Sequence, residues 1–238
     1  MDRAFSQYAS RHAKNELARL LASRGDVSSY RAAMLALGRQ LGRVIARMID
    51  HDERVLVGCG VEDADYVAKG VVESLEDHVG TRRVRFACFW NSRTRIGSVE
   101  QAPIVRQYIE RHARSIPHIV MVKSIISTSC AVHTNLAQLL DRVTPRTIYI
   151  AAPVIHRDAP FNLKREFDDE TARKLRYVYF AKDSTRDGNR MIVPGVGGSV
   201  YELLGLGNAA EKNSTVPSLV AERRKTGDRP DATAAFLR

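Results

Sequence analysis

The sequence lacks a long hydrophobic run. No apolar stretch of the 238-residue chain approaches the roughly 20 residues that a helix needs to cross a bilayer. Its first residues, MDRAFSQYASRHAK, are polar and charged, and they lack the apolar core of a signal peptide. We therefore expect a cytoplasmic protein that has no membrane partner.

Cysteine is scarce, and histidine is scattered. The three cysteines are Cys59, Cys88 and Cys130. Their odd number, wide spacing and lack of a C-x-x-C pair argue against a disulfide framework and against a zinc site. The histidines His51, His118 and His156 also lie outside any spacing that is typical of metal ligands. We expect reduced thiols, and no residue is predicted to ligate a metal.

Acidic residues are too few to balance the basic ones. The chain has 37 Lys and Arg against 27 Asp and Glu, which gives a formal net charge of +10. Such an excess attracts polyanions through the summed field of the molecule. Basic clusters occur at Arg82, Arg83 and Arg85, at Arg93 and Arg95, at Arg111 and Arg114, and at Arg223, Arg224 and Lys225. Each cluster can be a solvated face or a contact for an anionic ligand.

Hydrophobic periodicity divides the chain into helices and strands. Residues 1–50 predict an amino-terminal helical segment of two helices, the first ended by Gly25 and the second capped by Ser28 or Ser29. Strands are then expected in RVLVGCG, RRVRFACFW, HIVMV, RTIYIAAP and LRYVYFAKD, and helices near 62–75, in APIVRQYIERHAR and in AVHTNLAQLLDRV. This alternation predicts an α/β domain over 51–220 with a mainly parallel sheet flanked by helices. A charged tail over 221–238 completes the chain.

A run of small polar residues lies between a predicted strand and a predicted helix. Ser127, Thr128, Ser129 and Cys130 precede a helix that begins near Ala131. Backbone N–H groups at such a helix start bind anions, although the same residues are also typical of ordinary N-capping. Cys130 and His133 could pair as thiolate and imidazole, or Cys130 could simply be a small residue. Trp90, at a strand end, could stack on a base or pack in the core.

At this loop the sequence resembles the uracil phosphoribosyltransferases, which have the type I phosphoribosyltransferase fold. Their loop for phosphoribosyl pyrophosphate reads approximately D-P-M-L-A-T-G-G-S-A, and here Lys123 to Val132 reads K-S-I-I-S-T-S-C-A-V. IYIAAPVI is similar to their A-A-P-E-G-I strand, and MIVPGVGGSVYELLG to their I-V-P-G-L-G-D-A-G-D-R-L-F-G uracil loop. The resemblance covers roughly Ala13 to Leu206. It implies the type I fold, a homodimer or higher oligomer, a phosphorylated nucleotide-like ligand, and magnesium as a cofactor.

The resemblance also implies which residues form the site, although it identifies no catalytic residue. The phosphate- and ribose-binding residues are Lys123, Ser124, Ser127, Thr128, Ser129, Cys130 and Ala131. The pyrophosphate-binding residues are Gly58, Arg93 and Arg95. The base-binding residues are Ile192, Gly197, Gly198 and Ser199.

Several charged positions of the family pattern have changed. Lys123 replaces an aspartate that lies near the ribose hydroxyls, Gly58 replaces an arginine, and Gly198 and Tyr201 replace aspartates. A charge-assisted contact is worth about 1.5 to 3 kcal/mol, so losing several could reduce turnover by several powers of ten. Lys123 is then either a surface lysine in a disused site or a direct phosphate ligand.

Three functions follow from these observations. The first is a divergent uracil phosphoribosyltransferase-like protein that binds a nucleotide or phosphorylated ligand, with lost or altered transferase activity. The second is an active uracil phosphoribosyltransferase, in which Arg93, Arg95 and Lys123 bind pyrophosphate. The third is a nucleic-acid-binding or complex-forming accessory or defence module, for which the net charge of +10 is the support. We favour the first.

Overall fold

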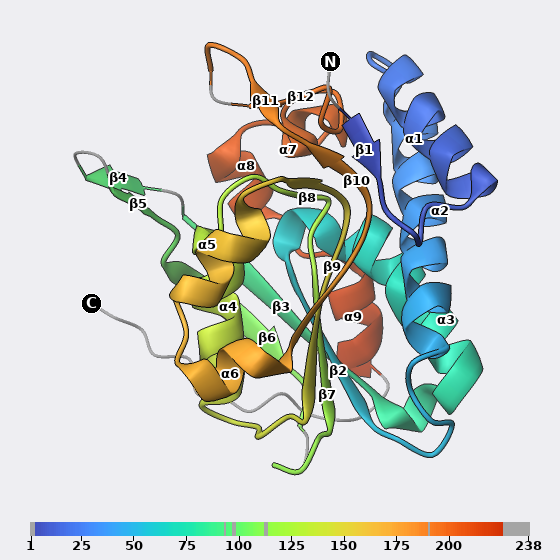
Figure 1. Cartoon of the computed structure of the whole chain (residues 1–238), viewed down its shortest axis with the longest axis vertical. Coiled ribbons are helices and arrows are strands. Elements are labelled where there is room, and N and C mark those ends of the chain that lie inside the picture. The colour runs from blue at the N-terminus through green and yellow to red at the C-terminus, as the bar shows by residue number, and fades with distance from the viewer. Residues whose placement is uncertain (1–2, 93, 97–98, 112–113, 190, 226–238) are drawn as a thin grey trace.

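A twisted sheet of mainly parallel strands runs through the molecule, with helices on both faces (Figure 1). The computed structural model describes residues 3–92, 94–96, 99–111, 114–189 and 191–225. The strand order is β1-β10-β9-β7-β2-β3-β6, and β8 pairs with β9 beyond the end of β7. The strands are β1 Arg3–Phe5, β2 Val55–Gly60, β3 Val84–Asn91, β6 Ile104–Ile109, β7 His118–Val122, β8 Ile125–Ile126, β9 Thr147–His156 and β10 Leu175–Asp183. Among the described strands of this sheet, the edge strands pair antiparallel, β1 with β10 and β6 with β3, and the other pairings are parallel.

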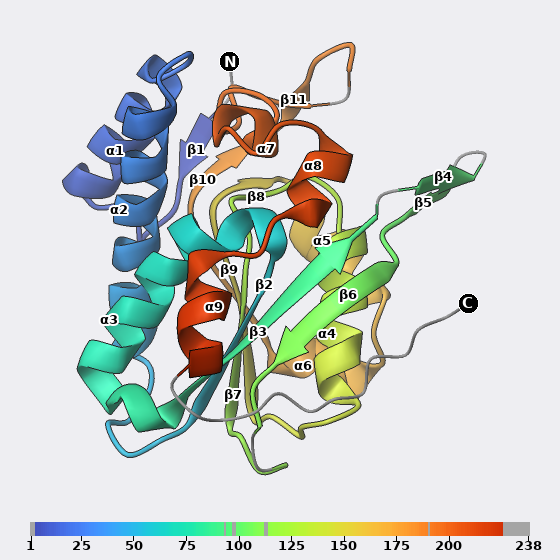
Figure 2. The same ribbon diagram turned by 180° about the vertical axis from the view of Figure 1, so that it is seen from behind.

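The helices form one layer on each face of the sheet (Figures 1 and 2). The first layer contains α1 Arg11–Ala22, α2 Val27–Ala46, α3 Lys69–Val79 and α9 Ser218–Lys225. The second contains α4 Cys130–Leu140, α5 Ala159–Arg165 and α6 Asp169–Lys174. Alternate strand residues enter the two cores: Val57 packs in the core beneath α2, and Leu56 packs in the core beneath α4. The expected α/β fold with a mainly parallel sheet and amino-terminal helices is confirmed.

Shorter elements surround the carboxyl end of the parallel strands, at the top of Figures 1 and 2. These are the hairpins β4 Thr94–Ile96 with β5 Val99–Gln101 and β11 Thr185–Arg186 with β12 Ile192–Val193, and the helices α7 Val200–Leu203 and α8 Ala209–Ser214. A 3₁₀ turn, Val61–Asp63, and a π-helical turn, Ala64–Ala68, lead from β2 into α3, and a 3₁₀ turn, Thr81–Arg83, leads from α3 into β3. None of the described helices is long and apolar enough to cross a membrane.

The amino-terminal helices begin and end differently from the prediction. α1 ends before Gly25, at the cap residue Ser23, and the N-cap of α2 is Asp26. The Asp26 carboxylate accepts the backbone N–H of Ser29 at 3.1 Å. Ser29 therefore donates its N–H to the capping side chain and is not itself the N-cap residue. The segment also contributes β1, which pairs with β10.

The predicted helix in residues 102–114 is wrong. Residues 104–109 form β6, whose Tyr108 and Ile109 lie opposite Cys88 and Ala87 of β3. Its spacing of apolar residues fits one helical face, but a short apolar run cannot distinguish helix from strand, and the open edge of β3 offers hydrogen bonds to a strand. The buried Glu110 continues this edge, because its carboxylate accepts the N–H of Phe86 at 2.9 Å.

The start of the predicted charged tail is helical. Residues 221–225 are the last turns of α9, and Arg223 forms ion pairs with Glu76 and Glu110. Residues 226–238 lie outside the described residues. The predicted helix near 62–75 corresponds to a continuous helical stretch, in which the 3₁₀ and π-helical turns over 61–68 lead into α3.

Candidate ligand-binding site

The hydroxyl loop connects β8 to α4 at the carboxyl edge of the sheet. Thr128 is exposed, whereas Ser129 and Ala131 are buried. Ser129 is the N-cap residue of α4, but its hydroxyl does not cap the helix; it donates to Glu166 Oε1. The first turn of α4 therefore lacks a side-chain cap. This arrangement leaves the start of an 11-residue helix suited to an anion.

An arginine that belongs to no sequence motif holds this loop. Arg186, on β11, donates from Nη2 to the Ser127 carbonyl at 2.6 Å and from Nη1 to the Ser127 hydroxyl. Burial, together with the positive charge of Arg186, lowers the pKa of the neighbouring His156. The edge of the sheet beside the loop therefore carries a fixed positive charge. No sequence motif links residues 127 and 186, so only the fold reveals the pair.

Lys123 is neither a surface lysine nor directed toward solvent. It is 7% exposed, and its Nζ donates to Glu62 Oε1 at 2.6 Å and lies 2.9 Å from Asp63 Oδ2. Asp63 also accepts the N–H of Ser124 at 2.9 Å and the Ser124 hydroxyl. The interpretation of Lys123 as a surface residue is wrong, because two carboxylates at the end of β2 enclose its ammonium group. Ser124 likewise contacts protein groups at its N–H and hydroxyl.

A second lysine completes this buried cluster from the carboxyl-terminal part of the chain. Lys212, in α8, is 5% exposed and lies 3.5 Å from Glu62 Oε2. Its Nζ also donates to the carbonyl of Asn91 at 3.3 Å. The side chain thus spans the ends of β2 and β3. Nearby, the Trp90 indole donates to the carbonyl of Thr215 at 2.9 Å, and Trp90 is fully buried.

The four charged groups perturb one another. Burial raises the pKa of Glu62, but the ammonium groups of Lys123 and Lys212 outweigh burial and hold it well below its usual range. Burial and the Glu62 carboxylate raise the pKa of Asp63, although Lys123 opposes them. Glu62 is therefore the ionised partner of both lysines.

Of the predicted pyrophosphate residues, the structure describes Gly58 and the backbone of Arg95. Gly58 lies in the middle of β2, between β3 and β7, and a Cβ there would meet Met121 Sδ at 2.9 Å and Leu139 Cδ1 at 3.0 Å. Its backbone is part of the sheet, so it does not reach the ligand edge. Arg93 lies outside the described residues. Arg95 belongs to β4, which pairs with β5 in the hairpin that precedes β6.

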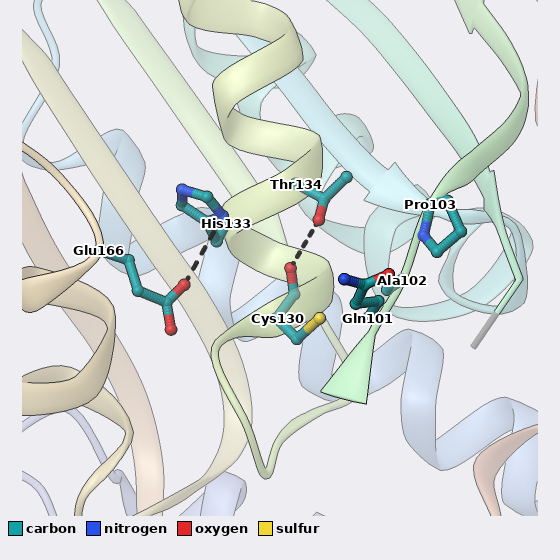
Figure 3. Close-up of a pocket in the computed structure, with 7 residues that line it drawn as sticks. All are labelled: Gln101, Ala102, Pro103, Cys130, His133, Thr134 and Glu166. Carbon is teal, nitrogen blue, oxygen red and sulfur yellow. Dashed lines mark hydrogen bonds and ion pairs between the residues drawn. The ribbon is translucent and has the colours of Figure 1, made fainter. Parts of the chain in front are cut away.

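A pocket of about 400 Å³ lies between the connection from β5 to β6 and the start of α4 (Figure 3). It is lined by Gln101, Ala102, Pro103, Cys130, His133, Thr134 and Glu166. His133 Nδ1 lies 3.7 Å from Glu166 Oε2, and the ring turns toward that carboxylate. The Cys130 sulfur points to the other side, toward Gln101. The suggested Cys130–His133 pair is therefore not formed.

The glycine-rich loop after β12 is fixed by the amino-terminal residues. Asp183 accepts the N–H of Gly195 at 2.9 Å and binds the Arg3 guanidinium at 2.8 and 2.7 Å. Tyr30, on α2, donates to the Val196 carbonyl at 2.9 Å.

Among the predicted base-binding residues, Ile192 is buried in β12, and Gly197 and Gly198 have φ values of 100° and 149°, which favour glycine.

Ser199, the fourth predicted base-binding residue, has a buried hydroxyl. Ser199 Oγ has no hydrogen-bond partner among the described residues, although Ser199 is the N-cap residue of α7. A buried hydroxyl without a partner costs about 1 to 3 kcal/mol. A polar ligand atom at this position would satisfy it.

The residues at this edge do not fit a magnesium ion. Magnesium is held by one or two carboxylates with water and phosphate, and the acidic pair here is Glu62 and Asp63. Both already face the ammonium groups of buried lysines, so a dication would be placed beside two positive charges.

Comparisons with known proteins identify similar folds. No protein-family model matches the chain, and no curated protein matches its sequence. The structure of the AQ2163 protein from Aquifex aeolicus is similar, with a TM-score of 0.64 and 11% identity, over 82% of this chain and 95% of that one.

Two phosphoribosyltransferases are similar over a smaller part of the chain. A hypoxanthine phosphoribosyltransferase from Staphylococcus aureus has a TM-score of 0.39 and 14% identity over 64% of this chain and 74% of that one. An adenine phosphoribosyltransferase from Thermoanaerobacter pseudethanolicus has a TM-score of 0.39 and 10% identity over 66% of this chain and 84% of that one. The AQ2163 structure therefore shows the shared fold, and these two looser likenesses add nothing about activity.

Proposed function

We propose that the protein is a divergent member of the uracil phosphoribosyltransferase type that binds a nucleotide or another phosphorylated ligand and has lost or altered the transfer reaction. Three features support binding. The start of α4 has no side-chain cap, Arg186 places a positive charge at the loop, and the hydroxyl of Ser199 is buried without a partner among the described residues. An anionic group would lie at the first two features, and a base at the third.

The observation that carries the loss or change of transfer is the Glu62–Asp63–Lys123–Lys212 cluster. Transfer from phosphoribosyl pyrophosphate develops positive charge on the ribosyl group, which acidic groups and a positioned pyrophosphate stabilise. Here the acidic pair at the end of β2 is neutralised inside the protein, and Lys212 covers the ends of β2 and β3. These two carboxylates are therefore paired with ammonium groups and are not available to a developing cation.

A uracil transfer assay tests this proposal. The purified full chain is incubated with uracil, phosphoribosyl pyrophosphate and magnesium, and uridine monophosphate is measured. We expect no formation above background in a sample that binds uridine monophosphate in calorimetry. Steady formation would instead establish the second candidate, an active uracil phosphoribosyltransferase with Arg95 and its neighbours on pyrophosphate.

A variant of the loop tests the binding part of the proposal. Thr128 is exposed, so Thr128→Ala should leave the melting temperature unchanged. Loss of a hydrogen bond to a charged phosphate, worth about 1.5 to 3 kcal/mol, should weaken binding of uridine monophosphate roughly tenfold or more. Equal affinity in the variant and the wild type would contradict a phosphate site at this loop.

The net charge of +10 supports a different candidate, a nucleic-acid-binding or complex-forming module. Internal ion pairs such as Arg3–Asp183 and Arg223–Glu76 each take one basic and one acidic residue, so they leave the net charge unchanged. A homodimer, which the family resemblance implies, also stays part of the proposal; light scattering of the full chain would test it.

A further inference from the structure

One arginine connects the two ends of the proposed nucleotide site. The guanidinium of Arg186 donates to the carbonyl and the hydroxyl of Ser127, which begins the phosphate loop. The backbone of Arg186 lies directly opposite Ile192 in the β11–β12 hairpin. Ile192 leads through Val193 into the glycine-rich loop that is proposed to hold the base.

The β11–β12 hairpin is fixed at both of its ends. At its base, the Asp183 carboxylate accepts the N–H of Gly195 at 2.9 Å. Near its tip, the Asp187 carboxylate accepts the N–H groups of Asn189 and Met191 at 2.9 and 2.8 Å. Such bonds to a charged acceptor are among the stronger hydrogen bonds in proteins. A hairpin held in this way transmits a displacement of Arg186 to Gly195.

The two segments also lie close together independently of the hairpin. A Cβ built on Gly195 would lie 3.3 Å from Ile125 Cδ1, and Ile125 belongs to β8, which leads into Ser127. The strand before the phosphate loop therefore lies close to the start of the base loop. Arg186 adds a directional contact to this packing, since its planar guanidinium makes two hydrogen bonds to one residue.

We infer that Arg186 is a positioning residue that couples the phosphate end of the ligand site to its base end. The inference rests on the proposed function, and it goes beyond it because it assigns a coupling role to a residue outside both loops. Ordering of Ser127 by a bound phosphate stabilises the Arg186 contact and, through the hairpin, the conformation of residues 195–199. By linkage, a bound base stabilises the phosphate loop to the same extent.

Three variants separate this role from a simple loss of charge. Arg186→Gln removes both the charge and the paired contact, and Arg186→Lys keeps the charge without the planar pair of donors. Arg176→Gln is the matched control, because Arg176 lies near the start of β10, at the opposite edge of the sheet, and bonds only backbone carbonyls of Arg173 and Leu175 in the described hydrogen bonds. Uridine, inorganic phosphate and uridine monophosphate are the calorimetric probes.

In the wild type, saturating inorganic phosphate should tighten uridine binding. In Arg186→Gln this effect should vanish, and uridine monophosphate should bind roughly tenfold more weakly, as expected for a lost charged hydrogen bond. Arg186→Lys should recover phosphate affinity in part but not the coupling, and Arg176→Gln should match the wild type. Coupling that survives in Arg186→Gln, or is fully restored by lysine, would overturn the inference.

Hydrogen exchange provides a readout that needs no ligand. Arg186→Gln should accelerate amide exchange both in residues 127–131 and in residues 195–199, whereas Arg176→Gln should change neither. Faster exchange in 127–131 alone, or in neither segment, would show that the two loops are not linked through Arg186. A wild type that binds neither phosphate nor uridine monophosphate would refute the proposed function, and the exchange pattern would still decide the linkage.

Discussion

At the scale of single residues, Lys123 carries the largest expected effect on stability. Lys123→Met removes the ammonium group that lies between Glu62 and Asp63 and leaves two carboxylates buried. Removing one partner of a buried ion pair costs about 3 to 5 kcal/mol. We expect a loss of this size in the free energy of unfolding, measured with urea.

The control for this variant is Lys174→Met. Lys174 pairs with Glu170, whose side chain is 75% exposed, and an exposed pair is worth about 0 to 1 kcal/mol. A loss below about 1 kcal/mol in Lys123→Met would contradict the importance of the buried cluster. By the same reasoning, Lys123→Asp should unfold the protein instead of restoring a magnesium-dependent site, because it would place a third carboxylate in the cluster.

Glu53, at the opposite edge of the sheet, makes the stability of the fold depend on pH. Its carboxylate binds His118 Nε2 at 2.6 Å and also the Arg146 guanidinium. Partial burial raises the pKa of Glu53, but these hydrogen bonds lower it to about 2, from an ordinary value of 4.5. The native state thus holds fewer protons than the unfolded state between these values, so Glu53 stabilises the fold above pH 4.5 and loses this effect as the pH falls toward 2.

Substituting Glu53 should therefore flatten the acid side of the stability curve. In Glu53→Gln, the unfolding free energy should fall less steeply than in the wild type as the pH is lowered from 4.5 toward 2. Glu73→Gln, which removes a partly exposed carboxylate paired with Arg39, is the control and should leave the slope unchanged. Parallel curves for wild type and Glu53→Gln would contradict the role of Glu53.

The sequence predicted few of the contacts that individual residues make. Lys123 was identifiable as a charge reversal, but its neutralisation depends on Glu62 and Asp63, which lie 61 and 60 positions away in the printed sequence. Arg186 belongs to no motif and meets Ser127 only because β8 and β11 lie at the same edge. Interactions between distant residues have no local pattern, and a single sequence does not reveal them.

At the scale of elements, the contact of α2 with α3 depends on glycine. A Cβ on Gly38 would lie 2.1 Å from the backbone oxygen of Val67, at the π-helical turn before α3. Alanine favours a helix over glycine by about 1 kcal/mol, but overpacking costs about 1 to 3 kcal/mol and here the clash is with backbone. We expect Gly38→Ala to lower the melting temperature.

A glycine in open space provides the comparison for Gly38→Ala. No atom lies within 4 Å of a Cβ on Gly188, so Gly188→Ala should leave the melting temperature nearly unchanged. If Gly38→Ala had the same melting temperature as the wild type, the two helices would be able to move apart at little cost.

The buried strands and long helices were predictable because their patterns are strong. β2, β7 and β9 are continuous apolar runs, which is typical of parallel strands that are covered on both faces. The prediction failed where the pattern was ambiguous, at β6, and where a cap was misread, at Asp26 instead of Ser28 or Ser29. The order of the strands and the closeness of the phosphate and base loops could be inferred only from the family resemblance or from the structure.

At the scale of the whole molecule, the net charge makes a separate prediction. A protein with a charge of +10 should bind nucleic acid without sequence preference, and that affinity should fall steeply as salt increases. Anisotropy with a labelled 20-nucleotide DNA, at about 50 and about 200 mM salt, measures this slope. Thr128→Ala should not alter it if the nucleotide site is distinct from the charged surface, and a large change would favour a nucleic-acid function for the loop itself.

The most direct test of the account is a calorimetric titration of the full chain with phosphoribosyl pyrophosphate, once in magnesium and once in EDTA. The loop, Arg186 and the lysine-neutralised cluster predict that the ligand binds in both buffers, since the carboxylates that could hold a metal are already paired. Binding only in magnesium, or no binding in either buffer, would contradict the account.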